Sequence, residues 1–161
     1  MTLMPFLQWL EHGQLGTAIR QSTLLFPVIE SLHVLAITAM VGTIAVVDLR
    51  LLGIASRERP IDELMDEVLP FTRWAFAAAA LSGSLLFISH AVDYSHKLPF
   101  LIKMGLLLLA LVNILVFHRL TVRNIQAWNH RRLPLTAKLG GGISLAIWIA
   151  IVAAGRWIGF V

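Results

Sequence analysis

The chain has 161 residues, of which 58% are hydrophobic and 14% are charged, and its mean hydropathy is +0.80. Soluble domains of this length are far more polar, so these values indicate a polytopic membrane protein. The absence of cysteine excludes disulfides, zinc fingers, iron–sulfur clusters and thiol nucleophiles. The 13 basic residues outnumber the 9 acidic ones, but they flank apolar segments and form no polar surface of their own, so we expect no nucleic-acid partner.

The first 21 residues are too interrupted by polar and glycine positions to cross a bilayer. Apolar residues nevertheless recur there at helical spacing, at Leu3, Phe6, Leu7 and Leu10, with Trp9 beside them. This pattern predicts an interfacial helix over about residues 3–21, lying against membrane lipid.

Four apolar runs are long enough to cross a hydrocarbon core of roughly 30 Å, which takes about 20 helical residues. These runs cover about residues 25–47, 70–92, 100–120 and 139–160. Residues 60–69 predict a separate short amphipathic helix before the second run. The expected fold is therefore all-α: a single transmembrane domain over residues 1–161, built as a polytopic four-helix bundle.

The basic residues divide unequally between the two ends of the bundle. The loops after the first and third spans hold nine of them: Arg50, Arg57, Arg59, Arg73, Arg119, Arg123, Arg131, Arg132 and Lys138. The other side holds Arg20, Lys97, Lys103 and Arg156. The positive-inside rule then places both termini in the periplasm, and we expect a multi-pass protein of the bacterial inner membrane.

Three ionisable residues lie inside the first span or at its edge, namely Glu30, His33 and Asp48. Each such group costs on the order of 2 to 3 kcal/mol in lipid, so it needs partners. At 100° per residue the three share one helix face, which should point into the bundle. The topology assigns Glu30 and His33 to the outer leaflet and Asp48 to the inner rim, where we expect a structural ion pair or a helix stop that meets Arg73 or His118.

Two histidines suggest chemistry in the outer leaflet. His33 and His90 come from adjacent antiparallel spans at similar depth, which is what a b-type haem needs for axial ligands on its two faces. Gly83, on the same face as His90, would give the macrocycle room. We expect haem b as the cofactor, with His33 and His90 as the metal ligands.

Charged residues on the same side fit the haem hypothesis. Lys103 and Arg156 are expected near the haem propionates, with Lys97 and Arg20 also available. Glu30 is expected either to accept an imidazole N–H from one of the two histidines or to form an ion pair with Lys103 or Arg156.

The expected function is electron transfer, between the quinone pool and a periplasmic redox partner. Two other classes stay open: a copper-handling or small-solute transport protein, for which Met40 and Met104 are soft ligand candidates, and a structural subunit whose polar groups only join helices. A homo-oligomer and a subunit of a larger complex are both compatible with the sequence, and no enzymatic activity is assigned.

The segments FPVIESLH and DLRLLG, followed by FLIKMGLLLLALVNILVFH and GRWIGFV, resemble a family of small uncharacterised four-helix bacterial inner-membrane proteins. The layout is also similar to that of copper-resistance D-type membrane proteins and of haem-binding bacterial protoporphyrinogen oxidases. The positions that carry this looser resemblance are His33, Gly42, Arg50, Lys103 and His118. The copper-resistance layout implies copper traffic, and the oxidase layout implies a haem bound through His33.

Overall fold

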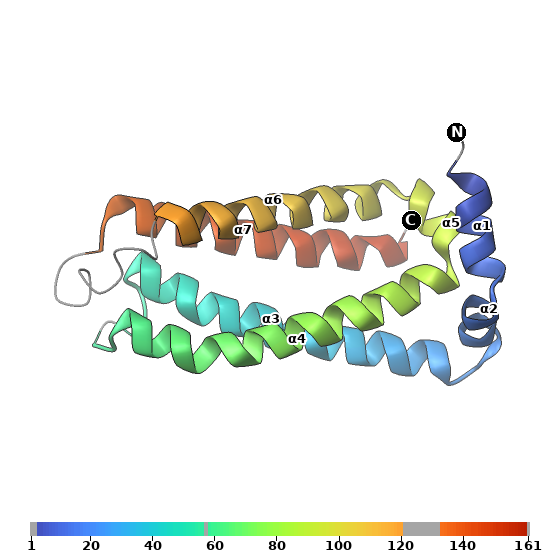
Figure 1. Cartoon of the computed structure of the whole chain (residues 1–161), viewed down its shortest axis with the longest axis horizontal. Coiled ribbons are helices and arrows are strands. Elements are labelled where there is room, and N and C mark those ends of the chain that lie inside the picture. The colour runs from blue at the N-terminus through green and yellow to red at the C-terminus, as the bar shows by residue number, and fades with distance from the viewer. Residues whose placement is uncertain (1–2, 57, 121–132, 161) are drawn as a thin grey trace.

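The structure is a computed structural model, which describes residues 3–56, 58–120 and 133–160. Four of its helices are long and apolar enough to cross a membrane: α3 (Leu25–Leu52), α4 (Ile61–Ser89), α6 (Leu98–Leu120) and α7 (Leu135–Trp157). They run antiparallel to their chain neighbours along the long axis of the molecule (Figure 1). No strand occurs in the described residues, so the expected all-α fold with four candidate spans is confirmed there.

The second span differs from the sequence-based expectation. Residues 60–69 do not form a separate helix, because α4 runs without interruption from Ile61 through Pro70 to Ser89. A proline inside a helix removes one backbone hydrogen bond, here to the carbonyl of Asp66. Asp66 and Pro70 are both exposed, so the freed carbonyl lies on the outer face of the helix and the helix continues.

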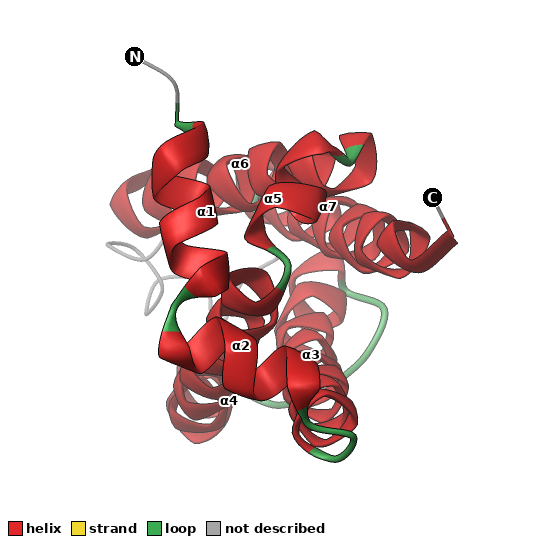
Figure 2. Ribbon diagram, turned by 90° about the vertical axis from the view of Figure 1, so that its right-hand side faces the viewer, coloured by secondary structure: helices red, strands yellow, loops and turns green. Residues whose placement is uncertain are grey.

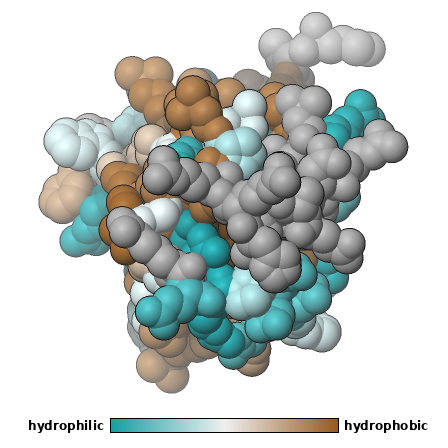
Figure 3. Space-filling model, turned by 90° about the vertical axis from the view of Figure 1, so that its left-hand side faces the viewer, coloured by the Kyte–Doolittle hydropathy of each residue, from teal (hydrophilic) through white to brown (hydrophobic). Residues whose placement is uncertain are grey.

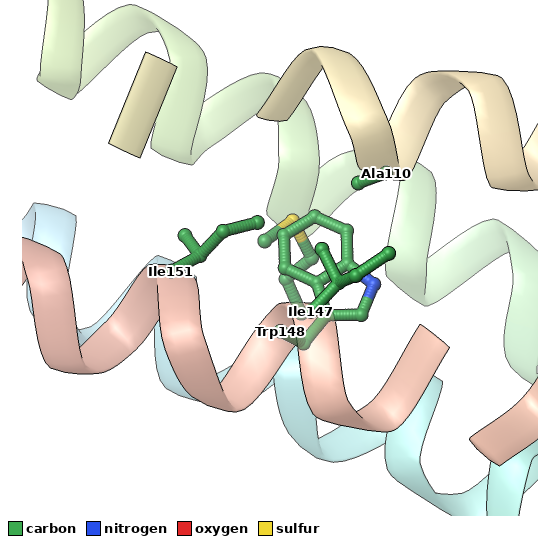
Figure 4. Packing of buried hydrophobic residues seen from close by; sticks show 5 residues of the cluster. Ala110, Ile147, Trp148 and Ile151 are labelled. Atoms are coloured by element: carbon green, nitrogen blue, oxygen red, sulfur yellow. The ribbon is translucent and has the colours of Figure 1, made fainter. Parts of the chain in front are cut away.

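The four long helices form two pairs. Helices α3 and α4 pack along their length, α6 packs on α7, and α7 also packs against α3 (Figure 1). The main hydrophobic core lies where α3, α6 and α7 meet, and it consists of Met40, Ala110, Ile147, Trp148 and Ile151. Figure 4 shows the side chains of α7 directed toward Ala110 of α6. This core ties the two pairs together at mid-length.

Three short helices cover one end of the bundle, which we call the capped end: α1 (Met4–His12), α2 (Gln14–Gln21) and α5 (Ala91–His96) (Figures 1 and 2). The expected interfacial helix over residues 3–21 is thus two helices, because the chain turns at Gly13, whose φ of −62° and ψ of 164° are extended. The segment after the second span, expected as a turn, contains α5. The chain ends at the capped end too, in a 3₁₀ turn over Ile158–Phe160 that we label η2.

The opposite end, which we call the far end, is where α3 ends and α4 begins. Hydrophilic side chains gather on this end face (Figure 3). They include the exposed ion pair between Arg59 Nη2 and Glu67 Oε2, at 2.8 Å. Arg57, Arg123, Arg131 and Arg132, four of the basic residues used to orient the chain, lie outside the described residues.

The sides of the bundle are apolar. Trp74 is 79% exposed and Leu81 is 70% exposed on α4, and Leu108 is 66% exposed on α6. Large apolar side chains exposed along the full length of a bundle are typical of lipid-facing surfaces, not of a soluble protein. The described helices therefore form a multi-pass membrane bundle.

Candidate functional site

His33 packs directly against α4. Its Nδ1 lies 3.0 Å from the Ser82 hydroxyl oxygen, and that hydroxyl donates its own proton to the Ala78 carbonyl at 2.6 Å. A serine hydroxyl has one proton, and its shorter contact is with the Ala78 carbonyl, so we assign Nδ1 of His33 as the donor in the bond to Ser82. The neutral imidazole then carries a free lone pair on Nε2, which is the form that ligates metals.

Gly83 lets the imidazole come this close. A Cβ at Gly83 would lie 2.8 Å from Cε1 of His33, closer than real side chains approach. The space beside Gly83 is thus filled by the His33 ring. From the sequence, Gly83 was expected to leave room for a macrocycle. In the structure, the His33 imidazole packs directly against Gly83.

Lys103 of α6 faces the same region from the other helix pair. Its Nζ lies 3.5 Å from the position that a Cβ on Gly155 would take, and its charge acts on His33. Within the described part of the chain, Lys103 has neither a hydrogen bond nor an ion pair. It is half-buried, so it presents a cation without a counter-ion beside an imidazole.

The other cations of the capped end have partners. Arg20 pairs with Glu11 at 3.4 Å, and Lys97 pairs with Asp93 at 3.2 Å and donates to the Ile158 carbonyl. Arg156 is exposed and lies 5.2 Å over the Phe160 ring. Of the four basic residues expected near an anionic group, Lys103 is the one that the described contacts leave available.

His90 lies in a break between two helices. It is the single residue between the end of α4 and the start of α5, and its backbone angles are φ −142° and ψ 45°. Two residues of the N-terminal helices hold the break: Arg20 donates to the Ser89 carbonyl at 3.1 Å, and Glu11 Oε2 accepts from the Val92 amide at 2.8 Å. Together they cap the end of one helix and the start of the next, and so fix the backbone of His90.

The His90 ring belongs to a group of aromatic side chains at the capped end. It lies 5.3 Å from the Phe26 ring, edge to face, and 5.9 Å from the Tyr94 ring. The group continues through Phe100, which stacks on Tyr94 at 5.9 Å and on Phe87 at 5.4 Å. The contacts link α3, α4, α5 and α6 at this end.

The two predicted haem ligands are not in contact. In the antiparallel pair of α3 and α4, His33 lies opposite Gly83 whereas His90 lies opposite Phe26. This is an offset of seven residues, or about 10 Å at 1.5 Å per residue. His90 is therefore nearer the capped end of the bundle than His33.

Glu30 is exposed and makes no hydrogen bond or ion pair with any described residue. It is not the acceptor for His33, since Ser82 has that role. Its charge acts on Tyr94 of α5: burial, and then the negative charges of Glu30 and Asp93, raise the pKa of this tyrosine above its ordinary value. The negative charge of Glu30 thus acts on Tyr94 of the aromatic group, and Glu30 does not position the His33 imidazole.

Asp48, at the far end, has a different partner from those expected. The Ser144 hydroxyl of α7 hydrogen-bonds to its carboxyl group, while Arg73 and His118 are both exposed and make no contact with it. The expectation of an ion pair with either residue is wrong, because Asp48 faces α7.

Sequence reasoning missed Ser82 and Ser144 as hydrogen-bond partners, and it missed the joint action of Glu11 and Arg20 on the helix break. Only the position of Ser82, one residue before Gly83, was available as a signal. The described residues contain no group of three or more histidine, aspartate or glutamate side chains that would hold a metal ion.

One comparison with known proteins finds a relationship. A model of a family of unknown function, DUF6644, matches residues 6–161. The chain belongs to this family. No curated protein and no solved structure matches the chain. The family therefore agrees with the expected uncharacterised family and supplies no activity.

Proposed function

We propose that this protein binds one b-type haem at the capped end of the bundle, with His33 as an axial ligand, and serves membrane electron transfer. The observation that carries the proposal is the 3.0 Å contact between Nδ1 of His33 and the Ser82 hydroxyl. With Nδ1 assigned as the donor, Nε2 of the neutral imidazole carries the lone pair that would bind iron. Haem-ligating and metal-ligating histidines are oriented in this way by a partner on the other ring nitrogen.

The surrounding residues fit such a group. Lys103 would supply an unpaired cation for a propionate carboxylate, and its ammonium lies beside Gly155 of α7. Gly83 and Ser82 hold the imidazole against α4, so the ligand orientation does not depend on the cofactor. Haem supplies one-electron exchange when it is bound.

His90 is the proposed second iron ligand. Its ring is engaged by Phe26 and Tyr94, and it is about 10 Å nearer the capped end than His33. To bind the iron, the His90 ring would have to leave its contacts with Phe26 and Tyr94. The coordination state is therefore the most informative spectroscopic readout: two imidazoles give a low-spin iron, and His33 alone gives a five-coordinate, high-spin iron.

The proposed setting is the bacterial inner membrane, with the capped end in the periplasm. The electron donors or acceptors we propose are a quinone and a periplasmic redox protein. A copper-handling or transport protein and a structural subunit are the competing functions. The Glu11 and Arg20 contacts favour a structural role for the α1–α2 segment, but they leave the unpaired Lys103 unexplained.

The absorbance spectrum of the protein purified after haem-supplemented expression tests the proposal. We expect a Soret band that shifts on dithionite reduction, and its loss in a His33→Ala variant. His12→Ala is the matched control, because His12 is exposed and its ring contacts only the Gln8 carbonyl. A haem-free wild-type protein would refute the proposal, and stoichiometric copper in that protein would support the competing function.

A further inference from the structure

Asp48 is a buried carboxyl group with an unused oxygen. Its side chain is 4% exposed, and its Oδ2 has no hydrogen-bond partner among the described residues. Ser144 of α7 hydrogen-bonds to the carboxyl group. Half of the hydrogen-bonding capacity of this carboxyl group is therefore unmatched inside the bundle.

Among the residues that the structure describes, no basic side chain pairs with the Asp48 carboxyl group. The backbone of Asp48 is covered by Gly141, where an added Cβ would lie 3.1 Å from the Asp48 carbonyl oxygen. A buried apolar cluster of Leu51, Ile61 and Ala137 packs in the same region. A carboxylate in such surroundings loses its hydration and gains no hydrogen bonds or opposite charge in return. The free-energy cost of burying that charge favours the protonated, neutral form of the group.

Nearby arginine and lysine residues are directed elsewhere. Arg50 is also buried, but it is two residues further along α3, about 200° around the helix, and its Nε donates to the Arg59 carbonyl at 3.0 Å. Arg59 pairs with Glu67. On the helices packed nearby, Arg73, His118, Arg119 and Lys138 are exposed.

We propose that Asp48 is a proton-binding site: its carboxyl group holds a proton at neutral pH, with Ser144 as its hydrogen-bonding partner. A proton fits better than a metal cation. Cations such as sodium or calcium need several oxygen ligands, whereas a proton needs only the one unmatched oxygen. The site is separate from His33, which is fifteen residues earlier on α3, so the proposal does not depend on haem.

Infrared difference spectroscopy of the full-length protein in lipid, labelled with ¹³C-carboxyl aspartate, tests the proposal. At neutral pH we expect the carbonyl-stretch band of a protonated aspartic acid, and we expect its loss in Asp48→Asn. Asp66→Asn is the control, because Asp66 is an exposed aspartate on α4 and its removal should leave the band unchanged. Carboxylate bands alone in the wild type, or a band that survives Asp48→Asn, would overturn the proposal.

Two further measurements keep the test decisive. If Asp48→Asn fails to fold, Ser144→Ala takes its place: loss of the hydrogen bond should shift the frequency of the band and retain its intensity, and an unshifted band would contradict the assignment. A band that is present only in the absence of sodium would identify a cation as the occupant and overturn the proton as the ligand.

Discussion

Replacing Gly83 by alanine tests the close packing of the His33 imidazole against α4. The new methyl group would lie 2.8 Å from Cε1 and 3.4 Å from Nδ1 of His33. Real Cβ atoms essentially never approach a neighbour to within 2.8 Å, so the ring must move away from α4. The movement also strains the 3.0 Å hydrogen bond from Nδ1 to Ser82, because that bond is made along the same helix face.

The magnitude follows from three opposing terms. Alanine gains about 1 kcal/mol over glycine in a helix. Overpacking at a tight contact costs about 1 to 3 kcal/mol, and a weakened side-chain hydrogen bond costs about 1 kcal/mol. The expected net effect is a loss of about 1 to 3 kcal/mol in the free energy of unfolding, together with a reduced affinity for haem.

Gly42→Ala is the matched control. Gly42 is also in a membrane helix, on α3, but an added Cβ there meets nothing within 4 Å. We expect Gly42→Ala to be neutral or to stabilise by up to about 1 kcal/mol. The assay is reversible unfolding of both variants in the same detergent, with ¹⁵N chemical shifts of the imidazole reporting the His33 tautomer. Equal stability of the two variants, with an unchanged Nδ1–H signal in Gly83→Ala, would refute the close contact.

Three other predictions concern the capped end. Lys103→Met should raise the free energy of unfolding of the haem-free protein by roughly 1 kcal/mol in a denaturant titration, because it removes a half-buried charge without a partner. The same variant should retain less haem. Lys138→Met, at an exposed position, should do neither. Glu11→Ala should cost about 1 to 2 kcal/mol and speed amide exchange at the start of α5, whereas Glu11→Gln, which keeps an acceptor, should cost less; equal costs would argue against the cap. Tyr94, the single tyrosine, should ionise above its usual pKa of about 10 in an ultraviolet titration. The burial of its neutral hydroxyl therefore stabilises the fold fully below about pH 10, and this contribution to the free energy of unfolding is lost as the pH rises through the raised pKa. Glu30→Gln should lower the pKa of Tyr94, because it removes one of the negative charges that raise it.

The four spans were predictable because hydropathy and length do not depend on which helices are neighbours. The structure begins and ends these helices within a few residues of the expected positions, except at α4. There, composition suggested a boundary at Pro70, and the exposure of that turn allowed the helix to continue. Local sequence signals are enough to predict a helix. The free-energy cost of a proline inside it depends on whether the carbonyl that loses its hydrogen bond is buried, and burial depends on the tertiary structure.

The side-chain partners were not predictable in this way. A helical wheel gives the direction of a side chain and says nothing about the neighbour it meets. His33 contacts Ser82 because of the antiparallel register of α3 and α4, and Asp48 contacts Ser144 because α7 packs beside α3. The helix break at His90 depends on Glu11, whose acceptor oxygen comes from 81 residues earlier in the chain than the Val92 amide it binds.

Helix α3 therefore carries two polar positions that are chemically separate. Fifteen residues, or roughly 22 Å, divide His33 from Asp48, and the core of Met40, Ile147 and Trp148 fills the bundle between them. Thr43 and Thr72 are polar in this interval, but their hydroxyls bond to each other and back to the carbonyls of their own helices. No continuous hydrogen-bonded path joins the two positions through the described side chains. The contacts at Gly83 and Gly141 also leave little room for α3 to slide against α4 or α7, so a proton at Asp48 is poorly placed to shift His33 by a helix movement.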